Sequence, residues 1–232
     1  NIEVLEDGKY RLILKTDAET LSLCSLSYER LGDADEKPVA ELSYDMKLWA
    51  SFNDWSGQDM QRNGDDLIWW CEADVPAGGG EFGIKNAAMD GWYSSENNSK
   101  NIVLEEGHYM FFIELEVVDG KPVLKDEIIA EEPAYYVVGT CGNAGWAADA
   151  NAENTAYKMT EQDSKYVLTV TFTEDETVDW AENKVAFKVA YGCGGKVANE
   201  NWFGAEGMDN VTVDPGTYTI TFDPATGAVT VE

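Results

Sequence analysis

The passage NIEVLEDGKYRLIL at residues 1–14 recurs as NIVLEEGHYMFFIEL at residues 101–115 and as NVTVDPGTYTITF at residues 210–222. Each copy has a short apolar run, an acidic turn that contains Gly, and a Tyr that opens an alternating apolar run. Alternation with a period of two is typical of a strand that buries one face. We interpret the passage as the closing hairpin of a repeated β-module, with Tyr10, Tyr109 and Tyr218 as packing residues.

Helix signals are weak in the rest of the chain, and short alternating runs are separated by Gly, Asn and Asp. The predicted strands cover residues 10–15, 20–25, 47–52, 66–73, 82–85, 102–104, 109–117, 135–139, 166–172, 185–191, 211–213, 217–222 and 228–232. Many short strands at regular spacing predict an all-β fold. We expect two tandem antiparallel β-sandwich modules of immunoglobulin-like type, plus an N-terminal β-hairpin.

Matching segments set the predicted domain boundaries. The run from Glu81 to Ile84 corresponds to that from Ala186 to Val189, and Trp92-Tyr93 corresponds to Trp202-Phe203. Residues 44–124 are predicted to form module A, residues 134–232 module B, and residues 125–133 a linker. Residues 1–43 match only the closing hairpin of a module. We expect this hairpin either to pack on module A or to precede it as part of a partial repeat. Since the chain begins inside a repeat and without Met, we expect a fragment of a longer protein, with its anchoring mode open.

The net charge of −28 comes from 44 acidic and 16 basic residues. Phosphate binding depends on Lys and Arg, so this charge argues against nucleic acids and anionic membranes as partners. No apolar run approaches the roughly 20 residues of a membrane helix. No Asp-x-Asp-x-Asp-Gly loop supports a structural calcium ion, and no cofactor is predicted.

The four cysteines include no Cys-x-x-Cys pair, and the one histidine is His108, so a zinc site is not expected. Cys141 and Cys193 lie in corresponding Gly-flanked loops. The sequence leaves open whether they form a disulfide or stay as reduced, partly buried thiols.

Familiar catalytic motifs are missing from the sequence, which has no Gly-x-Ser-x-Gly, His-Glu-x-x-His, P-loop or Rossmann glycine pattern. A single histidine cannot act as the base in both modules. We therefore expect a non-enzyme, with a glycoside hydrolase fragment that uses paired carboxylates as an open alternative.

The positive signal is aromatic, since the chain contains 8 Trp, 11 Tyr and 8 Phe. An aromatic ring can stack on a sugar ring while nearby amide, carboxylate and Lys groups bond its hydroxyls. Trp69 and Trp70 should face opposite sides of their strand, and Trp49 is expected in the core. The other tryptophans are expected in exposed loops. The candidate ligand-binding residues are Trp55, Trp92, Tyr93, Lys85 and Asn53 in module A, and Trp146, Trp202, Phe203, Lys188, Trp180, Asn143 and Asn201 in module B.

Module B carries GTCGNAGW, YKMTEQDSKYVLTVTF, VAFKVAYG, NWFG and VDPGTYTITFDPATGAVTV in this order. This set resembles the starch-binding β-sandwich modules of the SusE/SusF and pullulanase-appended type. The acidic tandem layout resembles non-catalytic cell-surface starch-binding proteins of a gut bacterial amylosome. Module A follows the pattern more loosely, because ASFNDW replaces the Gly-Trp turn.

The resemblance implies binding of starch and maltooligosaccharides, with Trp146, Trp202 and Lys188 around the glucan in module B. Trp55, Trp92 and Lys85 would take these roles in module A. It also implies a secreted or cell-surface monomer that works beside other surface amylolytic proteins. The alternative interpretation is a structural or protein-interaction module of a surface complex, without sugar affinity and with mostly buried tryptophans.

Overall fold

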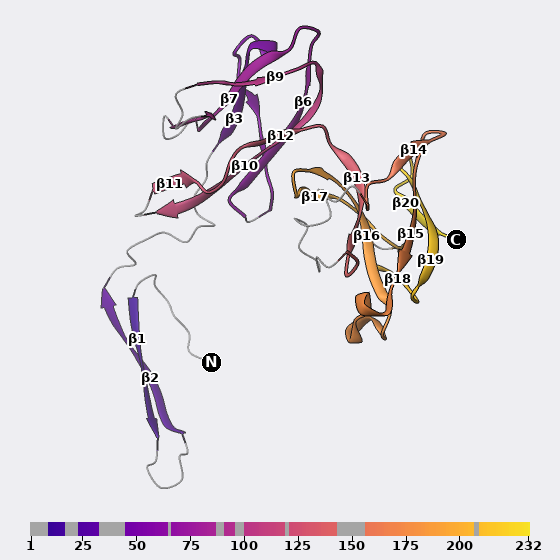
Figure 1. Ribbon diagram of the computed structural model, residues 1–232. Coiled ribbons are helices and arrows are strands. Elements are labelled where there is room, and N and C mark those ends of the chain that lie inside the picture. Colours follow the sequence, from indigo (N-terminus) through magenta and orange to yellow (C-terminus); the bar gives the residue numbers. More distant parts are fainter. Residues whose placement is uncertain are drawn as a thin grey trace. The chain divides into compact units, whose positions relative to one another are not determined.

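The computed structural model describes residues 9–16, 23–32, 45–64, 66–86, 91–95, 100–118, 121–142, 156–206 and 209–232, with the backbone alone at 9–16, 23–32 and 121 (Figure 1). The chain divides into two compact units. One comprises Asn1–Ser43 with Val117–Lys121, and the other comprises Tyr44–Glu116 with Pro122–Glu232. The second unit therefore contains strands of both predicted modules.

The first unit contains an antiparallel hairpin of β1 (Lys9–Thr16) and β2 (Leu23–Gly32). Leu12 lies opposite Tyr28, and Leu14 lies opposite Leu26. The second strand begins three residues later than the sequence predicts, since the predicted strand began at residue 20. The side chain of Tyr10 lies outside the described part of the structure.

Within the described residues, the second unit has four antiparallel sheets, and two of them are in module A. One sheet runs β11-β10-β6-β5, with β12 also paired to β10; the other runs β4-β3-β7-β8, with β9 also paired to β7. The strands of the first sheet are β5 (Gln61–Arg62), β6 (Ile68–Val75), β10 (Gly107–Val118), β11 (Lys121–Leu124) and β12 (Ile129–Glu131). Those of the second are β3 (Met46–Ala50), β4 (Gln58–Asp59), β7 (Gly80–Asn86), β8 (Gly91–Tyr93) and β9 (Ile102–Leu104). The strand β12 lies in the predicted linker.

Module B has the same two-sheet plan (Figure 1). One sheet contains β13 (Ala134–Gly139), β16 (Val185–Cys193), β17 (Lys196–Phe203) and β18 (Val211–Val213). The other contains β14 (Thr160–Gln162), β15 (Lys165–Phe172), β19 (Gly216–Asp223) and β20 (Ala228–Val231). Short 3₁₀ turns lie at η2 (Ser51–Asn53), η3 (Glu174–Glu176) and η4 (Asp179–Ala181). The all-β antiparallel fold predicted from the sequence is confirmed.

Each module buries apolar side chains from both of its sheets in one core. In module A, the rings of Phe82 from β7 and Phe111 from β10 meet edge to face, with centroids 5.0 Å apart. In module B, Phe187 from β16 packs against Phe172 from β15, with centroids 5.4 Å apart. Facing sheets that interdigitate in this way form the core of a β-sandwich.

A second apolar cluster joins the two modules. Trp70, Met110 and Phe112 project from the face of β6 and β10 opposite the module A core, and they contact Cys193 and Ala198 of module B. Partly buried Ile129 and Tyr191 pack against this cluster. The strand β10 is therefore buried on both faces, and this explains why four successive residues, from Met110 to Ile113, are at most 2% exposed.

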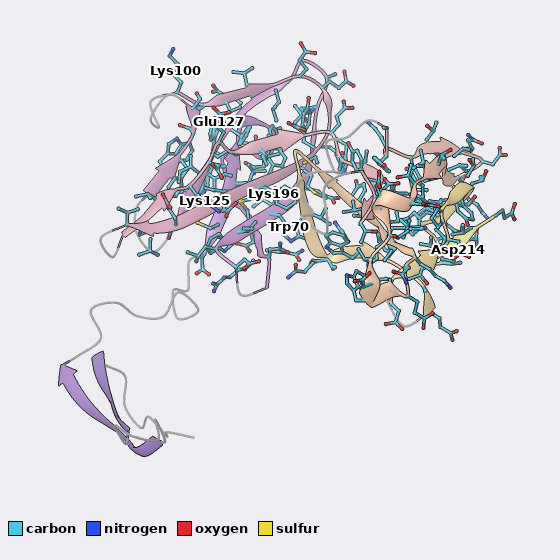
Figure 2. All side chains as sticks on the ribbon, turned by 60° about the horizontal axis from the view of Figure 1, so that its bottom comes forward. Trp70, Lys100, Lys125, Glu127, Lys196 and Asp214 are labelled. Atoms are coloured by element: carbon cyan, nitrogen blue, oxygen red, sulfur yellow. The ribbon has the colours of Figure 1, made fainter. Side chains whose placement is uncertain are left out.

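Polar groups reinforce this junction. The Asn63 side chain, which is 5% exposed, accepts a hydrogen bond from the Asn199 amide at 2.7 Å and donates to the Val197 carbonyl at 3.4 Å. The Glu114 carboxylate accepts hydrogen bonds from Lys196 at 2.6 Å and from Lys125 at 2.5 Å. Figure 2 shows Lys125, Lys196 and Trp70 in this region.

The cysteine positions settle the alternative that the sequence left open. Cys141 lies in the module B core, whereas Cys193 lies in the junction cluster with its Sγ atom 3.6 Å from the Met110 carbonyl oxygen. No disulfide joins these two described residues. Burial raises the pKa of the Cys193 thiol to about 12, so this thiol stays protonated.

Alternation along the strands corrects two expectations. Met46, Leu48 and Ala50 face the core, so Trp49 lies on the opposite, outer face, and its predicted core position is wrong. The predicted opposition of Trp69 and Trp70 is confirmed: Trp69 is buried and pairs across the sheet with Ile113, while Trp70 faces the module junction.

Candidate functional site

The outer face of sheet β4-β3-β7-β8 gathers aromatic and basic side chains from neighbouring strands. Across the sheet, Lys47 of β3 lies opposite Lys85 of β7, which lies opposite Trp92 of β8. Two residues further along β3, Trp49 lies opposite Gly83 of β7. Because residues two apart on a strand share a face, these five residues lie on one surface.

Glycine at position 83 makes room for Trp92. A Cβ atom there would lie 2.3 Å from Cζ2 of Trp92, which is closer than carbon atoms pack. The indole therefore lies directly over the backbone of β7. This contact makes Gly83 the floor on which the Trp92 ring rests.

A tight turn after β3 supplies a second ring. Asp54 and Trp55 both have a left-handed backbone, with φ of 53° at each. The Asn53 side chain holds the start of this turn by accepting a hydrogen bond from the Ala50 amide at 3.1 Å and donating to the Leu48 carbonyl at 3.0 Å. The turn brings the Trp55 ring beside that of Trp92, with centroids 6.5 Å apart and planes tilted by 37°.

Polar groups surround the Trp55–Trp92 pair. Lys85 lies next to Trp92 across the sheet, and Lys47 forms an ion pair with Asp59 of β4 at 2.5 Å. Asn53 was predicted to contact ligand, but both polar atoms of its side chain are engaged by the backbone. Tyr93 was predicted to stack on ligand; it is 7% exposed and lies on the opposite face of β8 from Trp92.

The structure adds Trp49 to this face. Its ring packs against the turn at Gly57, where an added Cβ would approach Cε2 of Trp49 to 2.8 Å. Its indole Nε1 is buried and has no hydrogen-bond partner among the described residues. The alternation of Met46, Leu48 and Ala50 was the signal that could have placed Trp49 outside the core.

In module B, Trp202 occupies the position that Trp92 has in module A. Trp202 pairs with Ala190 on β16, as Trp92 pairs with Lys85 on β7. Lys188 therefore corresponds to Gly83, and the two predicted lysines lie two residues apart in register. Both Trp92 and Trp202 were expected between strands, but they lie within β8 and β17.

Trp202 lines a cavity of about 380 Å³ at the junction of the two modules. Its neighbours from module B include Lys196 and Asn199, and module A contributes Asp66 and Glu114. Phe203, the next residue, faces the module B core instead, with its ring 4.6 Å from that of Phe222. Asn201 is half-buried on β17.

The remaining predicted residues of module B lie apart or outside the described range. Trp180 on η4 is 60% exposed and is the most exposed large aromatic side chain described. Asn143 and Trp146 fall outside the described residues. The backbone just before them is held by Glu176, whose carboxylate accepts hydrogen bonds from the Gly142 amide at 2.8 Å and the Tyr157 hydroxyl at 3.2 Å.

Two glutamates stay ionised through their partners. Partial burial raises the pKa of Glu114, but hydrogen bonds from Lys125 and Lys196 outweigh it and hold this pKa below its usual value. For Glu176, burial again raises the pKa, but hydrogen bonds from Gly142, Thr173 and Tyr157 outweigh this effect and hold the pKa below its usual value. Both carboxylates are structural anchors.

The described residues contain no group of three or more His, Cys, Asp or Glu side chains arranged to hold a metal ion. They also contain no helix with the length and apolar character needed to span a membrane. The expectation of no cofactor stays a prediction.

Known proteins were compared with this chain in sequence and in structure. No family model matches the chain, and no curated protein matches it. Among solved structures, the chain is similar to SusF from Bacteroides thetaiotaomicron, with 16% sequence identity and a TM-score of 0.32. The match covers 81% of this chain and 47% of the SusF chain, so the chain spans about half the length of that protein.

Proposed function

We propose that this chain binds α-glucan, such as starch and maltooligosaccharides, without catalysis, through the outer face of sheet β4-β3-β7-β8 in module A. The observation that carries the proposal is the pair of Trp55 and Trp92, in which Trp92 is held over Gly83 with Lys85 alongside. Aromatic side chains on a surface, with a few polar groups that fix orientation, are typical of small-molecule sites.

The angle between the rings favours a curved ligand. Two coplanar rings suit a flat, extended chain such as cellulose, whereas a platform of rings tilted by 37° suits a chain whose successive sugar rings are also tilted. A chain of α-1,4-linked glucose curves from one residue to the next and can follow this platform. The lysines at positions 47 and 85 lie where they can donate hydrogen bonds to sugar hydroxyls.

The setting of the platform supports a binding role over a hydrolytic one. The Asp59 carboxylate beside it is already paired with Lys47. His108 belongs to the other sheet of module A, where it contacts Asp74 at 2.7 Å. A hydrolase needs two carboxyl groups that flank one bond. By inference from the resemblance noted in the sequence, the protein would act at a bacterial surface beside amylolytic enzymes.

The test is retention on granular starch, followed by titration with maltoheptaose using Trp fluorescence and calorimetry. We expect Trp92→Ala to weaken binding about thirtyfold, the effect of losing roughly 2 kcal/mol at a central aromatic contact. Trp92→Phe should lose less, because a smaller ring still stacks. Cellohexaose should bind weakly or not at all.

A matched pair of lysine variants checks the polar part of the site. Lys85→Met should weaken maltoheptaose binding, whereas Lys165→Met, on the β14-β15-β19-β20 sheet of module B, should leave it unchanged. If the wild-type chain shows neither retention on starch nor a fluorescence change, the proposed function is wrong. If Trp92→Ala binds as wild type, the site lies elsewhere.

A further inference from the structure

We infer that the cavity between modules A and B is a second α-glucan site, with Trp202 of module B as its platform and Asp66 of module A as its hydrogen-bonding wall. The inference rests on the proposed function and deepens it, because it makes module B's site depend on its neighbour. Module B would then not bind as an independent unit.

The first observation is that Trp202 cannot reproduce the arrangement of Trp92. The ring of Trp92 lies over Gly83, where any Cβ would come within 2.3 Å of it. Lys188 occupies the corresponding position in module B, and its Cβ excludes the same ring placement. Trp202 lines the junction cavity instead, and it is half-buried there.

The second observation is the composition of the cavity. Its volume of about 380 Å³ is within the usual range for small-ligand sites and can hold a short sugar segment. Beside the indole it has apolar surface from Leu67, Ile68 and Phe112 and polar groups from both modules. An aromatic ring and hydrogen-bonding groups on facing walls provide what a sugar ring needs.

The third observation is the charge balance of the lining. Glu114 is neutralised by Lys125 and Lys196, to which it is bonded at 2.5 and 2.6 Å. The side chains of Asp66 and Asn199 are exposed and make no ion pair or side-chain hydrogen bond within the described residues. Two carboxylates and two ammonium groups give the cavity no excess charge, which favours a neutral, hydroxyl-rich ligand over an ion.

The fourth observation is that the walls are held in place. Asn63 binds both Asn199 and Val197 of β17, and the apolar cluster around Trp70 and Cys193 packs below. A wall fixed before the ligand arrives loses little conformational entropy on binding. The junction that bears the cavity is therefore preorganised.

The experiment uses the whole chain with the module A face disabled by Trp55→Ala and Trp92→Ala together. We expect this double variant to keep weaker maltoheptaose binding, measured by calorimetry, and Trp202→Ala to abolish that remainder. Adding Asp66→Asn to the double variant, without Trp202→Ala, should weaken the remaining binding about tenfold, because a hydrogen bond to a carboxylate becomes a weaker one to a neutral amide. Asp175→Asn, which removes a charge from exposed η3 in module B, is the matched control and should have no effect.

The outcomes separate the two proposals. If wild-type chain binds and the double variant has no affinity, the junction site is disproved while the module A site stands. Equal effects of Asp66→Asn and Asp175→Asn on the remaining binding would also overturn the junction site. If the wild-type chain itself does not bind, the proposed function fails and the junction site fails with it. Thermal unfolding of each variant verifies that the fold is intact.

Discussion

Trp55 combines a large aromatic side chain with a backbone that disfavours one. Its φ of 53° lies in the left-handed region, where a residue with a Cβ atom costs roughly 1–2 kcal/mol. Its amide donates to the Ala50 carbonyl at 2.9 Å, so the conformation is fixed by the turn. Strain kept at a bulky residue is typical of positions retained for function, and here the result is a ring placed beside Trp92.

Substitutions at Trp55 should separate stability from binding. We expect Trp55→Gly to leave the free energy of unfolding within about 1 kcal/mol of wild type, because relief of the left-handed strain offsets the lost contact with Trp92. Trp55→Ala keeps the strain and loses the contact, so it should be less stable than Trp55→Gly by about 1 kcal/mol. Chemical denaturation measures both values.

Both variants should lose maltoheptaose affinity to a similar extent, since each removes the ring. A finding that Trp55→Ala is the more stable of the two would contradict the role of strain. Unchanged affinity in either variant would show that Trp55 does not contact the sugar.

The strand β7 supports the Trp92 ring because one of its residues, Gly83, has no side chain. Its inward residues Phe82 and Ile84 are fully buried, whereas Gly83 between them exposes bare backbone to Trp92. Glycine weakens a strand interior because it adds no packing and has more freedom in the unfolded chain. In this strand the absence of a Cβ is what lets the indole lie flat.

Gly83→Ala should therefore displace Trp92 without unfolding the sandwich. The Cβ atom would lie 2.3 Å from the ring, so the ring must move. We expect maltoheptaose binding to weaken at least tenfold while the far-ultraviolet circular dichroism is unchanged. Losing most of one aromatic contact costs about 1.4 kcal/mol or more, which corresponds to a tenfold loss of affinity.

Gly216→Ala is the matched control, because Gly216 is also a strand glycine beside an aromatic residue. An added Cβ there approaches Tyr218 to 3.3 Å, which a small ring shift relieves. Binding should be unaffected in this variant. If Gly83→Ala binds as wild type, the position of Trp92 is not what creates the site.

Local pattern predicted most of the strands, but not the surfaces that they form. Period-two alternation placed β9 and β18 at their observed bounds and put Trp69 and Trp70 on opposite faces. Lys85 and Lys188 were given the same role although they are two residues apart in register, and strand pairing confirms that Lys188 corresponds to Gly83, as the match of residues 81–84 with residues 186–189 already implied.

The position of Trp202 could not be predicted at all. It lines a cavity whose other wall comes from residues more than 70 positions away in the chain, such as Asp66 and Glu114. No local period encodes a contact between modules. The same holds for Trp70, whose burial depends on Cys193 and Ala198.

In the whole molecule, the two hydrogen bonds that the Glu114 carboxylate accepts from Lys125 and Lys196 make stability depend on pH. The pKa of Glu114 is held below its usual value of 4.5, so the ionised carboxylate stabilises the folded state above that pH. The contribution is lost as the pH falls through the folded-state pKa. Falling pH also reduces the repulsion within a chain of net charge −28, which acts in the opposite direction.

Comparing wild type with Glu114→Gln at each pH separates the contribution of this carboxylate from the change in overall charge repulsion. We expect the variant to be less stable than wild type by about 1–2 kcal/mol at pH 7, as for other hydrogen bonds to charged groups. The difference should shrink as the pH falls below about 4.5, because the unfolded chain binds the proton first and the folded carboxylate follows at its lower pKa. Thermal and urea unfolding at each pH give the difference.

Glu106→Gln, a change at the exposed turn before β10, controls for the loss of one negative charge. It should differ little from wild type across the same range. A Glu114→Gln difference that is constant with pH would show that the ion pairs contribute nothing at pH 7.

The junction cluster also bears on how such a chain can be inherited. Separated from module A, module B would present Tyr191, Cys193 and Ala198 to water, and β17 would lose the amide of Asn63. Recombination that moved either repeat alone into another gene would carry an uncovered apolar face with it. We therefore expect modules A and B to be inherited and recombined together, as one unit.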